Sequence, residues 1–162
     1  MEKRVFLNMD RCCGCGSCAA ACSYGHLDQT YLLHSDVKGQ SWLPLHCKHC
    51  EQPTCVSACP NGAMKKSEED KVVRRNIFAC VGCGSCAVAC PFGVIDSELN
   101  RHIVAKCDLC SDWHKEGKAP RCVSTCTAKA LTHEEVDEAV EDKSKVLISD
   151  RLASNHPAIR RR

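Results

Sequence analysis

The stretch CVGCGSCAVACP at residues 80–91 contains four cysteines, separated by two, two and three intervening residues and followed by a proline. Residues 12–22 read CCGCGSCAAAC and match nine of the eleven positions of residues 80–90 at an offset of 68. A second pair of stretches, PTCVSAC at 53–59 and PRCVSTC at 120–126, repeats at an offset of 67. Two unrelated pairs with nearly the same offset indicate a duplicated unit that carries two cysteine motifs in each copy.

Sixteen of the 17 cysteines fall into four motifs, and Cys13 is left over. In chain order the motifs are Cys12-x2-Cys15-x2-Cys18-x3-Cys22, Cys47-x2-Cys50-x4-Cys55-x3-Cys59, Cys80-x2-Cys83-x2-Cys86-x3-Cys90 and Cys107-x2-Cys110-x11-Cys122-x3-Cys126. A cubane iron–sulfur cluster takes one thiolate at each iron, so three closely spaced cysteines wrap three of its corners. The fourth cysteine, three residues further on, ligates the other cluster of a pair. The first and third motifs therefore predict iron–sulfur clusters.

The composition requires the cysteines to stabilise the fold. Val, Leu, Ile and Phe total 32 of 162 residues, about 20%, which is too small an apolar core for a chain of this length. The first ten residues contain no signal-peptide stretch and no twin arginine, so we expect a cytoplasmic chain whose thiols stay reduced rather than forming disulfides. Zinc is the alternative for the second and fourth motifs, whose insertions depart from the strict pattern. Their repeat relationship favours iron–sulfur clusters there too.

Charge and missing motifs exclude several classes of function. The formal net charge is +2, and sixteen thiolates with four dicationic cluster cores would change it to about −6, which removes the electrostatic basis for nucleic-acid binding. No run of about 18 apolar residues predicts a membrane span. A glycine-rich phosphate loop and a dinucleotide fingerprint are both missing. Radical enzymes of the S-adenosylmethionine type need the motif CxxxCxxC. Cys18 and Cys22 match its first two cysteines, but Gly25 stands where the third would be. We therefore expect no catalytic residues and no enzymatic activity of the chain on its own.

The sequence predicts short elements between the cysteine loops. We expect the cysteine-free segment 144–162, which ends in three arginines, to be flexible or to dock onto a partner. The expected elements are strands at Val5–Leu7 and Ile103–Ala105, a hairpin over 63–74, single helical turns at 17–22 and 85–90, and a longer helix over 134–143.

The spacing of the motifs indicates how they pair. Only 20 residues separate Cys59 from Cys80, enough for one hairpin, so the second and third motifs should share a two-cluster module. The first and fourth motifs must then pair across it. This predicts an α+β fold with two nested, ferredoxin-like modules and little regular secondary structure. The expected boundaries are 45–91 for the inner module, 1–44 plus 92–143 for the outer module, and 144–162 for the tail.

From about residue 3 to 135, the layout resembles the four-cluster, ferredoxin-like electron-transfer subunits of complex iron–sulfur oxidoreductases. These include the beta subunits of formate dehydrogenases and of the dimethyl sulfoxide reductase group. Small cytosolic relatives serve carbon monoxide dehydrogenases, formate-linked hydrogenases and tungsten aldehyde oxidoreductases. The resemblance implies four [4Fe–4S] clusters and supports the nested pairing. It implies the ligand sets Cys12, Cys15, Cys18, Cys126; Cys107, Cys110, Cys122, Cys22; Cys47, Cys50, Cys55, Cys90; and Cys80, Cys83, Cys86, Cys59.

The resemblance also implies partners. In a hetero-oligomer, the chain would carry electrons between a catalytic subunit containing tungsten, molybdenum or nickel and an electron-accepting protein. We expect no anchoring helix of the kind found in the respiratory members, and this expectation favours the cytosolic relatives, with a tungsten aldehyde or formate-type partner. Ser23 and Thr127 depart from the family pattern, which prefers proline there, and weaken turn rigidity without affecting ligation. The alternative function is a freely diffusing polyferredoxin without a permanent partner, against which the cysteine-free tail argues.

A few other residues invite both a functional and a structural interpretation. Only one residue separates Cys13 from the next cysteine, so Cys13 does not begin a motif with the usual two-residue spacing. We therefore expect a small packing residue there rather than a ligand. His46 and His49 are close enough to the second motif to tune a cluster, but four cysteines already complete that site, so we expect plain loop residues. The segment Trp113–Lys115 in the long loop of the fourth motif suits either partner docking or shielding of a cluster from solvent.

Overall fold

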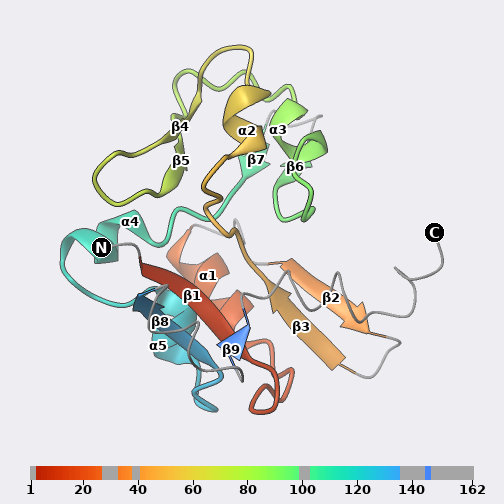
Figure 1. Cartoon of the computed structure of the whole chain (residues 1–162). Coiled ribbons are helices and arrows are strands. Elements are labelled where there is room, and N and C mark those ends of the chain that lie inside the picture. The colour runs from red at the N-terminus through yellow and green to blue at the C-terminus, as the bar shows by residue number, and fades with distance from the viewer. Residues whose placement is uncertain (1–2, 27–32, 38–40, 99–102, 136–144, 147–162) are drawn as a thin grey trace.

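The computed structural model describes residues 3–26, 33–37, 41–98, 103–135 and 145–146. These residues form short helices and strands joined by cysteine-bearing loops (Figure 1). The mixed α+β character and the scarcity of regular structure agree with the sequence prediction. The elements are β1 (Lys3–Asn8), α1 (Ser17–Gly25), β2 (Leu33–Val37), β3 (Ser41–Leu45), α2 (Thr54–Ser57), β4 (Met64–Lys66), β5 (Val73–Arg75), α3 (Ser85–Val88), β6 (Asp96–Glu98), β7 (Ile103–Ala105), α4 (Ser111–Lys115), α5 (Arg121–Thr125), β8 (Leu131–Glu135) and β9 (Lys145–Val146).

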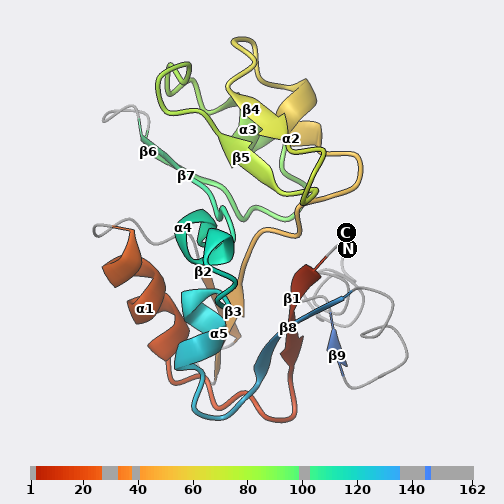
Figure 2. The ribbon, with the colours of Figure 1, turned by 90° about the vertical axis from the view of Figure 1, so that its left-hand side faces the viewer.

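A three-stranded antiparallel sheet of order β8-β1-β9 brings the two ends of the cysteine-rich region together. Val5 pairs with His133 and Leu7 with Leu131, and the run of apolar side chains in β1 is buried. Beside this sheet α1 and α5 pack against each other, as both views show (Figure 2). Because α1 carries cysteines of the first motif and α5 one of the fourth, this packing brings those motifs together.

The second and third motifs lie in the other half of the molecule, with α2, α3 and the hairpins β4–β5 and β6–β7 (Figure 1). Six buried residues there form an apolar cluster, namely Cys55, Met64, Val73, Cys86, Ile95 and Val104. Ile95 and Val104 follow the expected boundary at residue 91, so the inner half recruits apolar residues from the β6–β7 hairpin.

A second apolar cluster supports the first and fourth motifs. Its buried residues are Val5, Leu7, Cys18, Cys22, Val72, Leu109, Ala130 and Leu131. Val72 belongs to this cluster, whereas the next residue, Val73, belongs to the other. The two valines therefore join the halves, and cysteines make up part of both clusters, as the small number of aliphatic residues requires.

Several expected elements are confirmed. The strands at 5–7 and 103–105, the hairpin over 63–74 and the helical turn near 85–90 all form, while α1 extends beyond one turn to Gly25. The helix expected over 134–143 is wrong at its start, because Glu134 and Glu135 pair with β1 in strand β8. Pairing with an available strand edge outweighs local helix propensity there. Residues 136–143 lie outside the described residues.

Two features were not expected. The hairpin β2–β3 precedes the second motif, and the sequence signal that would have predicted it is Gly39 between two short runs that contain apolar residues. Lys145 and Val146, in the segment expected to be a tail, add strand β9 to the sheet; the rest of 144–162 lies outside the described residues. No helix in the described ranges is long and apolar enough to cross a membrane.

Candidate metal centres

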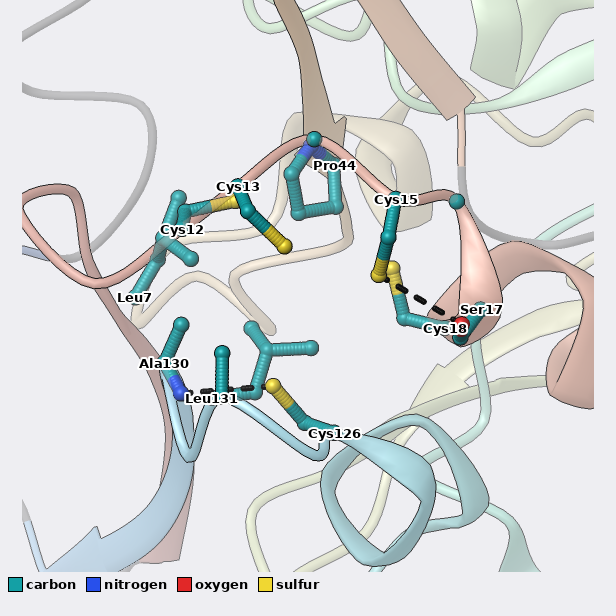
Figure 3. Close-up of a pocket in the computed structure, with 13 residues that line it drawn as sticks. Leu7, Cys12, Cys13, Cys15, Ser17, Cys18, Pro44, Cys126, Ala130 and Leu131 are labelled. Atoms are coloured by element: carbon teal, nitrogen blue, oxygen red, sulfur yellow. Dashed lines mark hydrogen bonds between the residues drawn. The ribbon is translucent and has the colours of Figure 1, made fainter.

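One cavity gathers cysteines from the two ends of the cysteine-rich region (Figure 3). The loop before α1 and its first turn supply the motif-one cysteines, and the end of α5 supplies Cys126 from the opposite wall. The backbone N–H of Ala130 donates a hydrogen bond to Sγ of Cys126 at 3.2 Å. Leu7 and Leu131 complete the wall. The sulfur-bearing residues that line this cavity are Cys12, Cys13, Cys15, Cys18 and Cys126.

A second cavity repeats this geometry in the other half of the molecule. The N–H of Ala63 donates to Sγ of Cys59 at 3.2 Å, matching the bond from Ala130 to Cys126. Ser85 Oγ lies 3.3 Å from Sγ of Cys83, and the equivalent distance between Ser17 and Cys15 is 3.4 Å. The repeated stretches of sequence therefore place equivalent cysteine sulfurs beside equivalent hydrogen-bond partners. The cysteines that line the second cavity are Cys59, Cys80, Cys83 and Cys86.

Gly16 and Gly84 explain how the loops of the first and third motifs turn. They precede α1 and α3 with φ angles of 73° and 74°, in the left-handed region that glycine adopts at little cost. This turn lets the cysteine loop curve around its cavity before the helix begins.

A third cavity is lined by cysteines of the first and fourth motifs, namely Cys22, Cys107, Cys110 and Cys122. Asp108 shapes its loop by accepting a hydrogen bond from the backbone N–H of Cys110 at 2.9 Å. The ring Nε2 of His26 lies 3.7 Å from Sγ of Cys110. Sequence reasoning missed both residues, because Asp108 occupies a position that the motif leaves open and His26 lies outside every motif.

Charge effects on pKa values connect the members of the fourth expected ligand set. These members are Cys47, Cys50, Cys55 and Cys90. Burial raises the pKa of Cys50, and the nearby Cys47 and Cys90 add to that rise. Burial also raises the pKa of Cys55, to about 11, with smaller contributions from the same two neighbours. The Thr54 hydroxyl donates to the carbonyl oxygen of Ala89 at 2.9 Å, which ties the start of α2 to the end of α3. The four cysteines therefore lie within each other's electrostatic range.

Burial favours the protonated form of several proposed ligand thiols as long as no iron is bound. Burial raises the pKa of Cys18 to about 11 and of Cys122 to about 12, and it raises that of Cys107 well above the ordinary range. These thiols are protonated at neutral pH and would lose their protons when they bind iron. The exposed Cys15 and Cys83 differ, since hydrogen bonds with Ser17 and Ser85 lower their pKa values.

The donor sets fit [4Fe–4S] clusters. Each of the three cavities offers four motif cysteines, three from one motif and one from another, as a pair of ferredoxin-type clusters requires. Backbone N–H groups already point at several of the sulfurs, and such bonds stabilise the negative charge of a ligated cluster.

The remaining candidate residues have clear positions. Cys13 is exposed and faces the first cavity, so its expected role as a packing residue stays a prediction. His46 and His49 lie in the loop, as expected, but are buried; Nε2 of His46 lies 2.9 Å from the carbonyl oxygen of Val5. The Trp113 ring is stacked on Arg121, whose guanidinium carbon is 4.5 Å from the ring centroid. The sequence carries no signal for this burial or stacking, which tertiary packing produces.

Comparison with known proteins gives a consistent result. The family described as 4Fe-4S dicluster domain matches residues 39–136, and the family described as 4Fe-4S binding domain matches residues 9–25. One chain of the anaerobic dimethyl sulfoxide reductase of Escherichia coli (strain K12) is 34% identical, covering 82% of the present chain and 73% of the relative. A protein of Rhodospirillum rubrum named "Iron-sulfur protein" is 34% identical, with 82% of each chain covered.

A more distant relative is the iron-sulfur subunit of the nitrate-inducible formate dehydrogenase of Escherichia coli (strain K12). It is 30% identical, over 88% of the present chain and 58% of its own length. The family match covers more than half of the chain and coincides with three of the four cysteine motifs. The chain therefore belongs to the 4Fe-4S dicluster domain family and is an iron–sulfur electron-transfer subunit of the oxidoreductase type.

Proposed function

We propose that the chain holds four [4Fe–4S] clusters and passes electrons between a catalytic oxidoreductase subunit and an electron acceptor. The observation that carries the proposal is that three cavities each gather four motif cysteines, three from one motif and one from another. The proposed ligand sets are Cys12, Cys15, Cys18, Cys126; Cys107, Cys110, Cys122, Cys22; Cys47, Cys50, Cys55, Cys90; and Cys80, Cys83, Cys86, Cys59. When bound, each cluster supplies a reversible one-electron couple with little change of its thiolate shell.

The crossing of ligands between motifs supports a nested arrangement. Cys126 of the fourth motif faces the cavity of the first motif, and Cys22 of the first lines that of the fourth. Cys59 of the second motif lines the cavity of the third. We propose an outer module formed by residues 1–44 and 92–143 and an inner module formed by 45–91, with Ile95 and Val104 completing the inner module's core.

The proposed order of the sites along the wire follows from their neighbours. Besides burial, the charge of Cys47 raises the pKa of Cys107, and on this ground we place the fourth-motif site beside the second-motif site. Cys18 and Cys22 both lie on α1, which links the first and fourth sites. The order is then first, fourth, second, third. Two cysteines of the terminal sites, Cys15 and Cys83, are exposed, which suits entry and exit of electrons at the two ends.

The partner is proposed from the relatives. Because one relative is a chain of a dimethyl sulfoxide reductase and another a subunit of a formate dehydrogenase, we propose a hetero-oligomer with a tungsten, molybdenum or nickel enzyme. A cytoplasmic location and a formate or aldehyde oxidoreductase partner belong to the same proposal. Anaerobic affinity purification from native cells tests it. Stoichiometric tungsten, molybdenum or nickel in the purified complex would support it, and a fully clustered chain that purifies alone would favour a diffusing polyferredoxin.

Paired substitutions test the proposed ligands. Cys126→Ser should remove about one to four iron atoms per chain and change the electron paramagnetic resonance (EPR) signal of a single cluster, since one iron loses its thiolate. Cys13→Ser is the matched control at the same cavity and should leave iron content unchanged. Equal iron content in both variants would contradict the ligand set, as would loss of iron only from Cys13→Ser.

A further inference from the structure

Lys106 is a buried lysine at the junction of the two halves. Only 4% of its surface is exposed, and it immediately precedes Cys107. Its Nζ donates hydrogen bonds to the carbonyl oxygen of Val73 at 2.5 Å and to that of Cys107 at 2.7 Å. One acceptor therefore lies in the apolar cluster of the inner half, and the other lies in the fourth motif.

Within the part of the chain that the structure describes, no carboxylate neutralises the charge of this ammonium. Among residues 3–26, 33–37, 41–98 and 103–135, no carboxylate forms an ion pair with Lys106. Both hydrogen-bond acceptors are neutral carbonyls. A buried charge is costly unless an opposite charge lies close by. The position of Lys106 therefore calls for an anion that the carboxylates of the described residues do not supply.

Proposed ligands of two different sites lie around Lys106. Cys107, of the proposed fourth-motif site, is the next residue in the chain, and its carbonyl oxygen accepts one of the hydrogen bonds from Nζ. Val73, whose carbonyl oxygen accepts the other, packs in the same apolar cluster as Cys55 of the proposed second-motif site. The same ammonium therefore lies between one proposed ligand from each of the two central sites.

The side chain beside Lys106 adds no competing positive charge. His49 is 1% exposed, and its Nδ1 accepts a hydrogen bond from the backbone N–H of Val73 at 3.0 Å. Burial, followed by the charges of Lys106 and Arg4, holds the pKa of His49 well below its ordinary value, so the ring is neutral. Arg4 donates to the carbonyl oxygens of His49 and Lys71, both at 3.3 Å. Arg4 also contacts both halves, but Lys106 is the buried cation that directly precedes a proposed ligand and donates to the carbonyl oxygen of that ligand.

We propose that Lys106 is a counter-ion shared by the two central clusters, and that its ammonium raises the reduction potential of both. This inference rests on the proposed function. Reduction adds one negative charge to a cluster, and a fixed positive charge in a poorly solvated region stabilises that charge. The terminal sites each have an exposed cysteine, where solvent screens charge more effectively. Lys106 acts through the charge of its ammonium group and does not bind iron as a ligand.

The test uses the full chain, purified anaerobically with its clusters. Lys106→Gln and Lys106→Met remove the charge, Lys106→Arg retains it, and Lys65→Gln on the exposed face of β4 is the control. Redox titration followed by EPR gives the potential of each cluster, and iron analysis gives the cluster content. We expect the neutral variants to make reduction at least tenfold less favourable at two clusters, which is about 59 mV for a one-electron couple. Lys106→Arg should restore most of the shift, and Lys65→Gln should show none.

The outcomes separate this inference from the proposed function. Neutral variants with about sixteen irons per chain and unchanged potentials, or with equal shifts at all four clusters, would overturn the role of Lys106. If a neutral variant binds less iron, loss limited to about half of the clusters supports a shared counter-ion. Uniform loss from all four sites contradicts it. Fewer than four clusters in the unaltered chain would instead overturn the proposed function.

Discussion

At the scale of single residues, hydrogen bonds and ion pairs order the segments that connect the cysteine loops. Asp70 shows this in the β4–β5 hairpin, where Oδ1 accepts hydrogen bonds from Nη1 of Arg74 at 3.0 Å and from the N–H of Val72 at 3.1 Å. Val72 and Val73 join the two apolar clusters, so this small network fixes the register at the junction of the halves.

The ion pair of Asp70 gives a pH dependence. The Arg74 guanidinium holds the pKa of Asp70 well below its ordinary value, so the carboxylate stabilises the fold above about pH 4 and loses that effect as pH falls further. Both side chains are partly exposed, so Asp70→Asn should lower the free energy of unfolding by only about 1 kcal/mol at pH 7. Urea denaturation of the clustered protein should show a constant difference from pH 7 to about pH 5 and a smaller one below about pH 4. A difference that grows on acidification would contradict this assignment.

At the scale of elements, the contact between α1 and α5 pairs the first motif with the fourth. Gly25 ends α1 and faces the side chain of Arg121, the first residue of α5. Arg121 donates to Asp112 at 3.1 and 2.6 Å and stacks on Trp113, which fixes the long loop of the fourth motif. The absence of a side chain at Gly25 therefore permits this close approach.

Gly25→Ala tests that contact. A methyl group there would collide with Cδ and Nε of Arg121, and the flexible arginine would swing away from Asp112. Because Asp112 is largely exposed, the loss should not exceed about 1 kcal/mol. A double-mutant cycle with Arg121→Ala, measured by urea denaturation, should make the two changes non-additive. Additive effects would show that Gly25 matters for another reason.

The sequence predicted those elements whose signal is local. Residues 80–91 and their repeat predicted the cysteine loops and helical turns, and the polar segment 67–70 between two short runs predicted the hairpin over 63–74. Strand β8 at Glu134 was missed because its partner β1 lies more than a hundred residues away in the chain. The burial of His49 and Lys106 was also missed, since charged and polar side chains are rarely buried and only tertiary packing places them there.

At the scale of the whole molecule, cysteines replace part of the hydrophobic core. Cys18 and Cys22 belong to one buried cluster, and Cys55 and Cys86 belong to the other. Only about one residue in five is Val, Leu, Ile or Phe. The chain therefore buries too little apolar surface to fold stably without its clusters. Metal binding and folding should therefore be coupled.

Removal of iron should unfold the protein. An iron chelator under reducing, anaerobic conditions should abolish the far-ultraviolet circular dichroism signal in step with the loss of visible absorbance from the clusters. Reconstitution with iron and sulfide should restore both signals. A native far-ultraviolet signal that persists after complete iron removal would show that the polypeptide core is sufficient by itself.

The most direct test of the central claim is the iron and acid-labile sulfide content of the chain purified without exposure to air. Four clusters on sixteen cysteines predict about sixteen atoms of each per chain. About eight atoms of each would mean that only two of the proposed sites bind clusters. Zinc in place of iron would contradict the account of this chain as an electron-transfer subunit.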